Sequence, residues 1–248
     1  MNFSNSAYRP ITERWQAPEY GGSECERLAK AKRLDDQLGQ IAAKHKSVSF
    51  ACSFSIEDII LVERIASLGL GITIFAIDTG RLPGETLEFA DHIGDHYGVS
   101  IHRIAPDSES LQKLAGLQHD DDIYLSESFR KKCCEVRKLA PLGRALAHAD
   151  AWVTGMRREQ SATRASIAYK EFDHARGIAK FNPLVEWSTA EVWSFARQQK
   201  IPIHPLHERG YPSIGCAPCT RAVRAHEDLR AGRWWWLSND SKECGLHQ

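Results

Sequence analysis

The feature that most constrains the fold is an alternation of short apolar runs with longer amphipathic segments. Runs rich in β-branched and aromatic residues cover positions 47–53, 72–78, 99–105 and 151–155. Segments of helical period cover about 23–45, 57–69 and 85–96, and another begins after 108. Strands separated by helical crossovers form a mainly parallel sheet, so we expect an α/β fold with a twisted sheet and helices on both faces.

The regularity weakens after residue 155. One more helix is expected near 187–200, with Ser188 or Thr189 as N-cap and Glu191 completing a capping box. Earlier, the segment 57–69 should turn an apolar face inward and end at Gly69. That face consists of Ile59, Ile60, Val62, Ile65, Ala66 and Leu68. We find no repeat and no linker, and expect residues 1–248 to form one domain with an irregular C-terminal segment and a mobile tail at 237–248.

Charge and cysteine content narrow the class of protein. The 32 basic residues balance the 32 acidic ones, which argues against nucleic acid and against an anionic membrane surface as partners. The chain shows no signal peptide and no membrane-length apolar stretch, and its odd number of cysteines, 7, suits a reducing compartment. We therefore expect a cytoplasmic protein, in which Cys25 and Cys52 are small buried side chains.

Two cysteine pairs are candidates for a metal site. Cys216 and Cys219 flank two residues, and Cys133 is followed directly by Cys134. Four thiolates suit either tetrahedral zinc or a [4Fe–4S] cluster, and adjacent helical residues, which point about 100° apart, favour the larger cluster. Such a site is anionic, and the first pair lies among basic residues. These are Arg130, Lys131, Lys132, Arg137 and Lys138, the last one helical turn after Cys134.

Several strings together carry a family resemblance. They are "CC" at 133–134, "TGMRREQSATR" at 154–164, "KFNPL" at 180–184, "LHERGYPSIGCAPCTR" at 206–221, "GRWWW" at 232–236 and "ECGLH" at 243–247. In this order they resemble the bacterial assimilatory adenylyl-sulfate reductases, over about residues 48–247.

The resemblance implies a fold, a reaction and partners. The fold would be the adenine nucleotide alpha hydrolase-like fold of ATP pyrophosphatases, with a [4Fe–4S] cluster on Cys133, Cys134, Cys216 and Cys219 and a nucleophile at Cys244. The reaction would convert adenosine 5′-phosphosulfate and reduced thioredoxin into sulfite, AMP and oxidised thioredoxin, through an S-sulfocysteine. Related phosphoadenylyl-sulfate reductases generally lack both cysteine pairs, and family members are often homo-oligomers.

The same resemblance, with the residue chemistry, predicts a substrate site. Hydroxyls and helix N-terminal amides at 53–58 can hold an anion, although Ser55 stands where many reductases have Gly. The full predicted set is Ser53, Ser55, Asp78, Thr79, Gly80, Arg81, Lys138, Gly155, Arg158, Gln160, Ser161, Arg164, Arg230, Arg233 and His247.

Three alternatives remain open at this stage. The chain could instead reduce the 3′-phosphorylated nucleotide, act as an ATP pyrophosphatase, or be a zinc-stapled module without catalysis. The triplet Trp234 to Trp236 also has two interpretations, because three consecutive indoles cannot all be buried on one face. It is either core packing with a hinge for the tail, or a docking surface for thioredoxin.

Overall fold

The computed structural model describes residues 13–20, 22–117 and 123–237. Its strands form one sheet in the order β3-β2-β1-β4-β6-β5. Pairing is parallel from β3 to β6, and only β5 runs antiparallel, against β6 at the edge. The strands are β1 (Val48–Ala51), β2 (Ile72–Ile77), β3 (Ile101–Ile104), β4 (Ala151–Val153), β5 (Lys170–Asp173) and β6 (Ile178–Phe181). The expected α/β class and mainly parallel sheet are confirmed.

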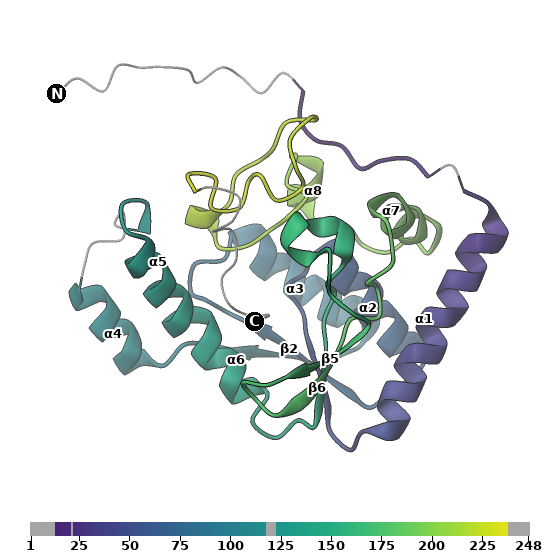
Figure 1. Ribbon diagram of the computed structural model, residues 1–248, viewed down its shortest axis with the longest axis horizontal. Helices are drawn as coiled ribbons and strands as arrows, with labels where there is room; N and C mark the ends of the chain where they lie inside the picture. The colour runs from purple at the N-terminus through teal and green to yellow at the C-terminus, as the bar shows by residue number, and fades with distance from the viewer. Residues whose placement is uncertain (1–12, 21, 118–122, 238–248) are drawn as a thin grey trace.

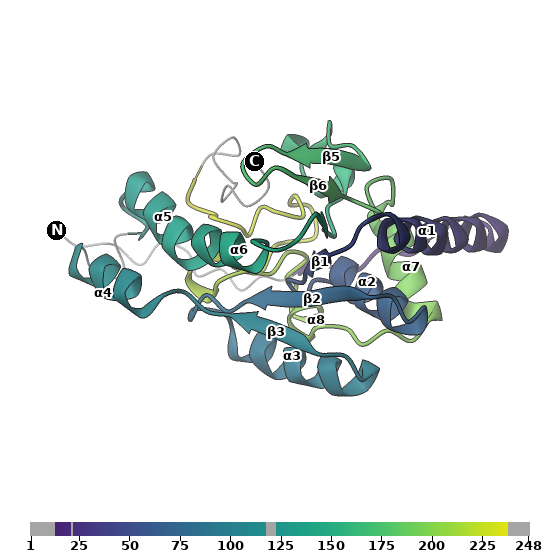
Figure 2. The same cartoon turned by 90° about the horizontal axis from the view of Figure 1, so that it is seen from below.

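Helices cover both faces of this sheet (Figures 1 and 2). They are α1 (Glu24–Lys44), α2 (Ile56–Ser67), α3 (Gly84–Tyr97), α4 (Ser108–Leu117), α5 (Glu127–Cys134), α6 (Ala140–Ala145), α7 (Thr189–Gln198) and α8 (Pro205–Glu208). A π-helical turn, Glu135–Leu139, joins α5 to α6, and single 3-10 turns span Arg158–Gln160, Ala162–Arg164 and Ala217–Cys219.

Strand alternation divides the core into two parts. Val48 and Phe50 of β1 face the larger core, which also takes apolar side chains from α1, α2, α3 and α7. Phe75 of β2 and Trp152 of β4 face the opposite side, where Leu142 of α6 packs on them. Successive strand residues therefore alternate between two helical layers, as the period of a strand requires. Figure 2 shows α6 and α3 on opposite sides of the sheet.

Local signals fix several helix ends as expected. Ser188 is the N-cap of α7 and forms the capping box with Glu191. Gly69, the residue after the C-cap of α2, has a φ of 59°, in the left-handed region that glycine adopts without strain.

Three details of the sequence analysis need correction. Leu68 is 40% exposed because α2 ends at Ser67, so it does not belong to the buried face. Cys25 is exposed, on the solvent side of α1, whereas Cys52 is buried as expected. The hairpin of β5 and β6 was not predicted. Most residues of these two short strands lie at or near the surface, and apolar and polar residues do not alternate along them.

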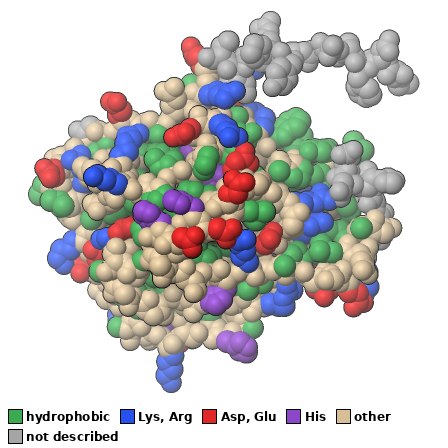
Figure 3. All heavy atoms as spheres, turned by 180° about the vertical axis from the view of Figure 1, so that it is seen from behind, with side chains coloured by type: hydrophobic (Ala, Val, Ile, Leu, Met, Phe, Trp, Pro, Cys, Tyr) green, Lys and Arg blue, Asp and Glu red, His purple; other side chains and the backbone are tan. Residues whose placement is uncertain are grey.

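The described residues contain no helix suited to spanning a membrane, and the charges on one face of the molecule are mixed. Within 13–20, 22–117 and 123–237, no helix combines the length and the apolar character that crossing a bilayer requires. On the face drawn in Figure 3, basic and acidic side chains are interspersed. This agrees with the balanced composition of the chain.

Candidate active site

A large cavity lies at the carboxyl ends of β1, β2 and β4. Its wall includes the residues that follow each of these strands, together with residues of the C-terminal segment. Strand order reverses here, because β2 lies on one side of β1 and β4 on the other. Ligands of open α/β sheets bind at such a switch point. Nine predicted substrate residues line this cavity: Ser53, Ser55, Thr79, Lys138, Gly155, Gln160, Arg164, Arg230 and Arg233.

The loop between β1 and α2 forms the floor of the cavity. Ser53 and Ser55 place their hydroxyl oxygens 3.0 Å apart, at the start of α2. The position that demands an unusual backbone is Phe54, with a φ of 64°, whereas Ser55 has a φ of −68° that any residue can adopt. Ser55 in place of glycine therefore leaves this backbone unstrained, and two hydroxyl groups face the helix N-terminus.

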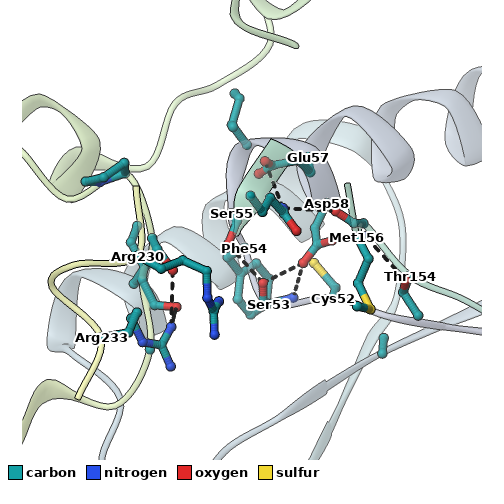
Figure 4. Close-up of a pocket in the computed structure, with 18 of the residues that line it drawn as sticks. Cys52, Ser53, Phe54, Ser55, Glu57, Asp58, Thr154, Met156, Arg230 and Arg233 are labelled. Atoms are coloured by element: carbon teal, nitrogen blue, oxygen red, sulfur yellow. Dashed lines mark hydrogen bonds between the residues drawn. The ribbon is translucent and has the colours of Figure 1, made fainter. Parts of the chain in front are cut away.

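Asp58, in the first turn of α2, is a buried carboxylate that contacts this loop. The backbone N–H and the hydroxyl of Ser53 both donate to its Oδ2 atom at 2.6 Å, as Figure 4 shows. Burial raises the pKa of Asp58 to about 7, although the hydrogen bonds from Ser53 act in the opposite direction. A Cβ atom at Gly155 would collide with the Asp58 carboxylate, so the loop after β4 can approach only because residue 155 is glycine.

Glu57 forms a buried ion pair that the sequence analysis missed. Arg157 donates from Nε to Glu57 Oε1 at 2.9 Å, and Gln160 Nε2 donates to the same oxygen at 3.0 Å. Burial opposes ionisation of Glu57, but Arg157 and Gln160 outweigh it and hold its pKa below the ordinary value. The pair ties the start of α2 to the segment after β4.

Arg158 stands one residue further on and lies outside the cavity. Its Nε donates to the Ile167 carbonyl, and it approaches Glu186 at the surface. Of two adjacent arginines, the first rather than the predicted second therefore lines the site. Because 158–160 form a 3-10 turn, the two side chains diverge, a local geometry for which the string "RRE" carries no signal.

Four more predicted residues do not line the large cavity, and two positions are not described. Ser161 bonds to Thr163, and Asp78 accepts from the backbone N–H of Gly80 within its own turn. Arg81 instead lines a second cavity, described next. Cys244 and His247 lie outside the described residues.

The second cavity brings the two cysteine pairs together. Cys133, Cys134, Cys216 and Cys219 all line it, with Arg81, Arg130, Arg137 and Lys138 as its basic residues. Cys216 and Lys138 also line the large cavity. One thiol and one ammonium group thus belong to the wall between the two spaces.

The π-helical turn modifies the expected position of Lys138. The backbone N–H of Ala140 donates to the Glu135 carbonyl, five residues back, which inserts an extra residue into this turn. The α-helical spacing from Cys134 to Lys138 therefore does not hold, although Lys138 still reaches both cavities.

The chemistry of the second cavity fits a four-thiolate cofactor. Burial raises the pKa of Cys216, yet Lys138, the Thr79 hydroxyl and nearby arginines outweigh it, so that pKa lies below its ordinary value. Thr79 Oγ1 lies 3.3 Å from Cys216 Sγ. No three metal-binding side chains among the described residues surround one ion-sized point, so the fit rests on the donor type, the shared cavity and the surrounding cations.

The C-terminal segment closes the large cavity from the far side. Figure 4 shows Arg230 and Arg233 across the cavity from Ser53 and Asp58. Arg233 donates to the Ile214 carbonyl at 2.6 Å, and a Cβ atom at Gly215 would collide with its guanidinium group. Trp234 is fully buried beside these arginines, whereas Trp235 is 48% exposed. The three consecutive indoles are therefore not all buried, as expected.

Comparisons with known proteins agree with this architecture. The family model of the phosphoadenosine phosphosulfate reductase domain matches residues 47–222. A protein of Burkholderia cepacia described as adenosine 5′-phosphosulfate reductase is 50% identical over 90% of this chain and 89% of its own length. One of Allochromatium vinosum with the same description is 51% identical over 85% of this chain and 82% of its own.

A solved structure supports the fold. The crystal structure of phosphoadenylyl-sulfate reductase from Candida auris, a phosphate complex, superposes with a TM-score of 0.65 at 21% identity, and covers 83% of this chain and 100% of that one. At this identity the likeness concerns the fold alone. With the family match over most of the chain and close relatives over almost its full length, the chain belongs to the phosphoadenosine phosphosulfate reductase family.

Proposed function

We propose that this chain is an adenosine 5′-phosphosulfate reductase that takes its electrons from reduced thioredoxin. The relatives of about half identical sequence carry the name of that activity. The observation within the structure that carries the proposal is the shared wall of the two cavities. Cys216 and Lys138 line both, so an anion-binding space lies directly against a thiolate site.

The large cavity suits a nucleotide with an anionic end. Its apolar wall, which includes Trp15, Phe75 and Trp152, can bury a base, and the hydroxyls of Ser53 and Ser55 face the anion. Arg164, Arg230, Arg233 and Lys138 supply positive charge around the same space. These cations offset the repulsion between a phosphosulfate group and an approaching thiolate.

The chemistry assigned to Cys244 balances with a dithiol as reductant. Its thiolate attacks the sulfur of the phosphosulfate, the bond from that sulfur to the bridging oxygen breaks, and AMP leaves with the electron pair. A thioredoxin thiolate then attacks Cys244 Sγ and expels sulfite, which leaves a mixed disulfide. The second thioredoxin thiol resolves that disulfide, so two electrons pass from the dithiol to the sulfonate.

The cofactor assigned to the second cavity is a [4Fe–4S] cluster. Cys133, Cys134, Cys216 and Cys219 would hold it, and it would supply a compact anionic centre that joins the end of α5 to the Cys216 loop. Arg81, Arg137 and Lys138 stand where they can compensate that charge. The same donors also bind zinc, and a brown colour of the purified protein, with iron rather than zinc on analysis, distinguishes the two.

An apolar surface beside these cavities is the docking site that we assign to thioredoxin. It consists of Tyr124, Leu125 and Trp235, with Tyr124 and Trp235 ring centroids 6.3 Å apart and Leu125 84% exposed. Cys244 follows Leu237, the last described residue, by seven positions, and a fully extended chain of that length spans at most about 25 Å. A protein that attacks Cys244 can therefore rest on this surface.

The central test is the formation of the covalent intermediate. Protein mixed with adenosine 5′-phosphosulfate and no thioredoxin should gain the mass of one SO₃ on the peptide that contains Cys244, because no second thiol is present to release it. Added thioredoxin should then release one equivalent of sulfite. The Cys244→Ser variant should bind the nucleotide, keep its cofactor and form no adduct.

Two outcomes would contradict the proposal. One is sulfite release at the parental rate by Cys244→Ser, and the other is ATP turnover without sulfite, as expected of a pyrophosphatase. A parallel measurement with the 3′-phosphorylated nucleotide decides between the two sulfonucleotides. We expect faster adduct formation without the 3′-phosphate, because the close relatives are named for the nucleotide that lacks it.

A further inference from the structure

Trp234 stands at the centre of a cluster of cations. Its ring centroid lies 4.9 Å from the guanidinium carbon of Arg233 and 5.4 Å from that of Arg130. The guanidinium carbon of Arg230 lies at 6.0 Å, and the ammonium nitrogen of Lys138 at 5.9 Å. Four cations from two distant parts of the sequence thus surround one indole, which is itself fully buried.

The backbone fixes this indole in place at some conformational cost. Trp234 has a φ of 41°, which a bulky residue adopts only where its surroundings impose it. Its backbone N–H donates to the Cys219 carbonyl at 3.1 Å, and the backbone N–H of Arg221 donates to the Gly232 carbonyl between the same two segments. Trp234 is therefore anchored to the loop that carries Cys216 and Cys219.

Its position links the two cavities. Trp234 lines the large cavity and packs in one apolar cluster with Cys216 and Cys219. Of the cations around it, Arg230 and Arg233 line the large cavity and Arg130 lines the second cavity. Lys138 lines both. For comparison, Arg176 and Lys180 lie over the ring of Trp152 at 6.0 and 5.7 Å.

Cation–π attraction can offset the mutual repulsion of the charges in this cluster. Like charges gathered around one buried side chain repel one another, although one of them, Arg130, also approaches Glu127 at 3.9 Å, and a bound anion lowers this repulsion. The face of an indole is the most electron-rich among aromatic side chains and attracts guanidinium and ammonium groups. A buried indole can therefore keep cations together without neutralising them, as a carboxylate would.

We propose that Trp234 is a positioning residue of the anion site. Its ring holds Arg230, Arg233 and Lys138 at the wall between the two cavities, ready for an anionic nucleotide. An aspartate or glutamate in its place would compete with the anion for the same cations, whereas the indole carries no negative charge of its own. The inference rests on the proposed function only for the identity of the nucleotide.

Fluorinated tryptophans at position 234 test the role of the ring. One to three ring fluorines keep the indole shape but withdraw electron density from its face, so a change in volume cannot explain the result. In the Cys244→Ser background, where substrate is not consumed, the dissociation constant of adenosine 5′-phosphosulfate should rise stepwise, by about tenfold in total. Adenosine, which has no anionic group, should bind with unchanged affinity.

The same substitutions at Trp235 are the matched control, because that neighbouring indole is half-exposed and has no cation contact among the described residues. Fluorinated tryptophans at position 235 should leave nucleotide affinity unchanged. A double-mutant cycle adds a second measurement. Arg230→Gln should weaken binding by about tenfold with ordinary tryptophan at 234 and by only about twofold with the most fluorinated one.

Three outcomes would each overturn the proposal. Nucleotide affinity could stay constant across the fluorinated tryptophans at position 234, adenosine affinity could fall equally, or the effects of fluorine and of Arg230→Gln could be fully independent. Affinity that rises with fluorine would also overturn it, because fluorine strengthens the indole N–H as a donor. These outcomes are separate from those of the reductase assay. A parent protein that binds the nucleotide but forms no adduct contradicts the proposed reaction and leaves the fluorine series decisive for Trp234.

Discussion

At the scale of single residues, the adjacent arginines 157 and 158 have opposite structural roles. Arg157 is 2% exposed and pairs with the buried Glu57, whereas Arg158 lies at the surface. Removal of one partner of a buried ion pair leaves the other charge uncompensated. Arg157→Met should therefore lower the free energy of unfolding by about 3 to 5 kcal/mol. Arg158→Met, the matched control, should lower it by less than about 1 kcal/mol.

Urea unfolding of both variants measures this difference. Equal losses for the two would show that the pair with Glu57 contributes no more than a surface contact. The comparison uses the same chemical change at neighbouring positions, so composition and unfolded-state effects nearly cancel.

Asp58 gives the folded protein a pH dependence of known sign. Its pKa is about 7 in the folded state against an ordinary 3.8. Between these values the unfolded chain has released the proton and the folded protein has kept it, so stability falls as pH rises through this window and is constant above it. The full loss is on the order of 4 kcal/mol.

Asp58→Asn should remove most of this slope, because an amide oxygen can still accept from Ser53 and never ionises. The variant should be clearly more stable than the parent at about pH 8, and close to it at about pH 4. Unfolding midpoints across that range provide the measurement. A stability difference that does not change with pH would contradict the assignment.

The residue scale also shows the limits of the sequence patterns. Ser53, Gln160, Arg164 and the cavity arginines could be predicted because motif and residue chemistry coincide. Arg157 could not, since only the turn after β4 decides which of two arginines points inward. The left-handed φ of Phe54 could not be predicted either, because the fold imposes it and phenylalanine does not favour that conformation.

At the scale of elements, Gly155 decides how closely β4 and the loop before α2 can approach. A methyl group there would collide with Asp58. Gly155→Ala should displace the loop with Ser53, and we expect nucleotide affinity to fall by about tenfold or more, since a small displacement of positioning groups is costly.

Gly143→Ala is the control, because nothing lies within 4 Å of a Cβ atom at that position of α6. Alanine favours a helix, so this variant should keep parental affinity and gain up to about 1 kcal/mol of stability. Calorimetric titration with AMP and thermal unfolding measure both quantities. Parental affinity in Gly155→Ala would mean that the loop tolerates the displacement.

The parallel strands were the most predictable elements. Each of β1, β2 and β4 is a short apolar run bounded by polar or small residues, and two faces must be buried. The strands β5 and β6 lack that signal, since Lys170 and Phe172 are exposed and the edge strand has one uncovered side. The π-helical turn after α5 was also unpredictable, because a single extra residue in a helical turn is not marked by any characteristic amino-acid composition.

At the scale of the whole molecule, Leu125, in the apolar surface of Tyr124, Leu125 and Trp235, precedes the start of α5 by two positions. Figure 1 shows α5 on the opposite side of the ribbon from α1, where Leu28 is 63% exposed. A charge at Leu125 would be buried against a protein partner docked there. Leu125→Glu should reduce kcat/KM for thioredoxin by about tenfold or more and leave adduct formation unchanged. Leu28→Glu, the control, should change neither.

Stopped-flow kinetics with thioredoxin, beside mass spectrometry without it, separate the two steps. An unchanged kcat/KM in Leu125→Glu would place the reductant elsewhere. A change in sedimentation coefficient instead would identify the surface as a contact between copies of this chain.

The assembly of the site was only partly visible in the sequence. The cysteine pairs, some 80 positions apart, could be assigned to one centre by their number and chemistry. That Cys216 and Lys138 belong to two cavities at once could not be derived, because it depends on how the C-terminal segment crosses the end of the sheet.

That crossing has a mechanical consequence. From Arg209 to Leu237 the described chain has no helix longer than a 3-10 turn and no named strand. Backbone bonds such as Ala217 to Arg81 and Trp15 to Val223, together with buried side chains such as Trp234, connect it to the rest. A nucleotide bound to Ser53 on one side and to Arg230 on the other would connect this segment to the sheet and restrict its motion. The filled enzyme should thus resist protease cleavage within 209–237 far longer than the empty one.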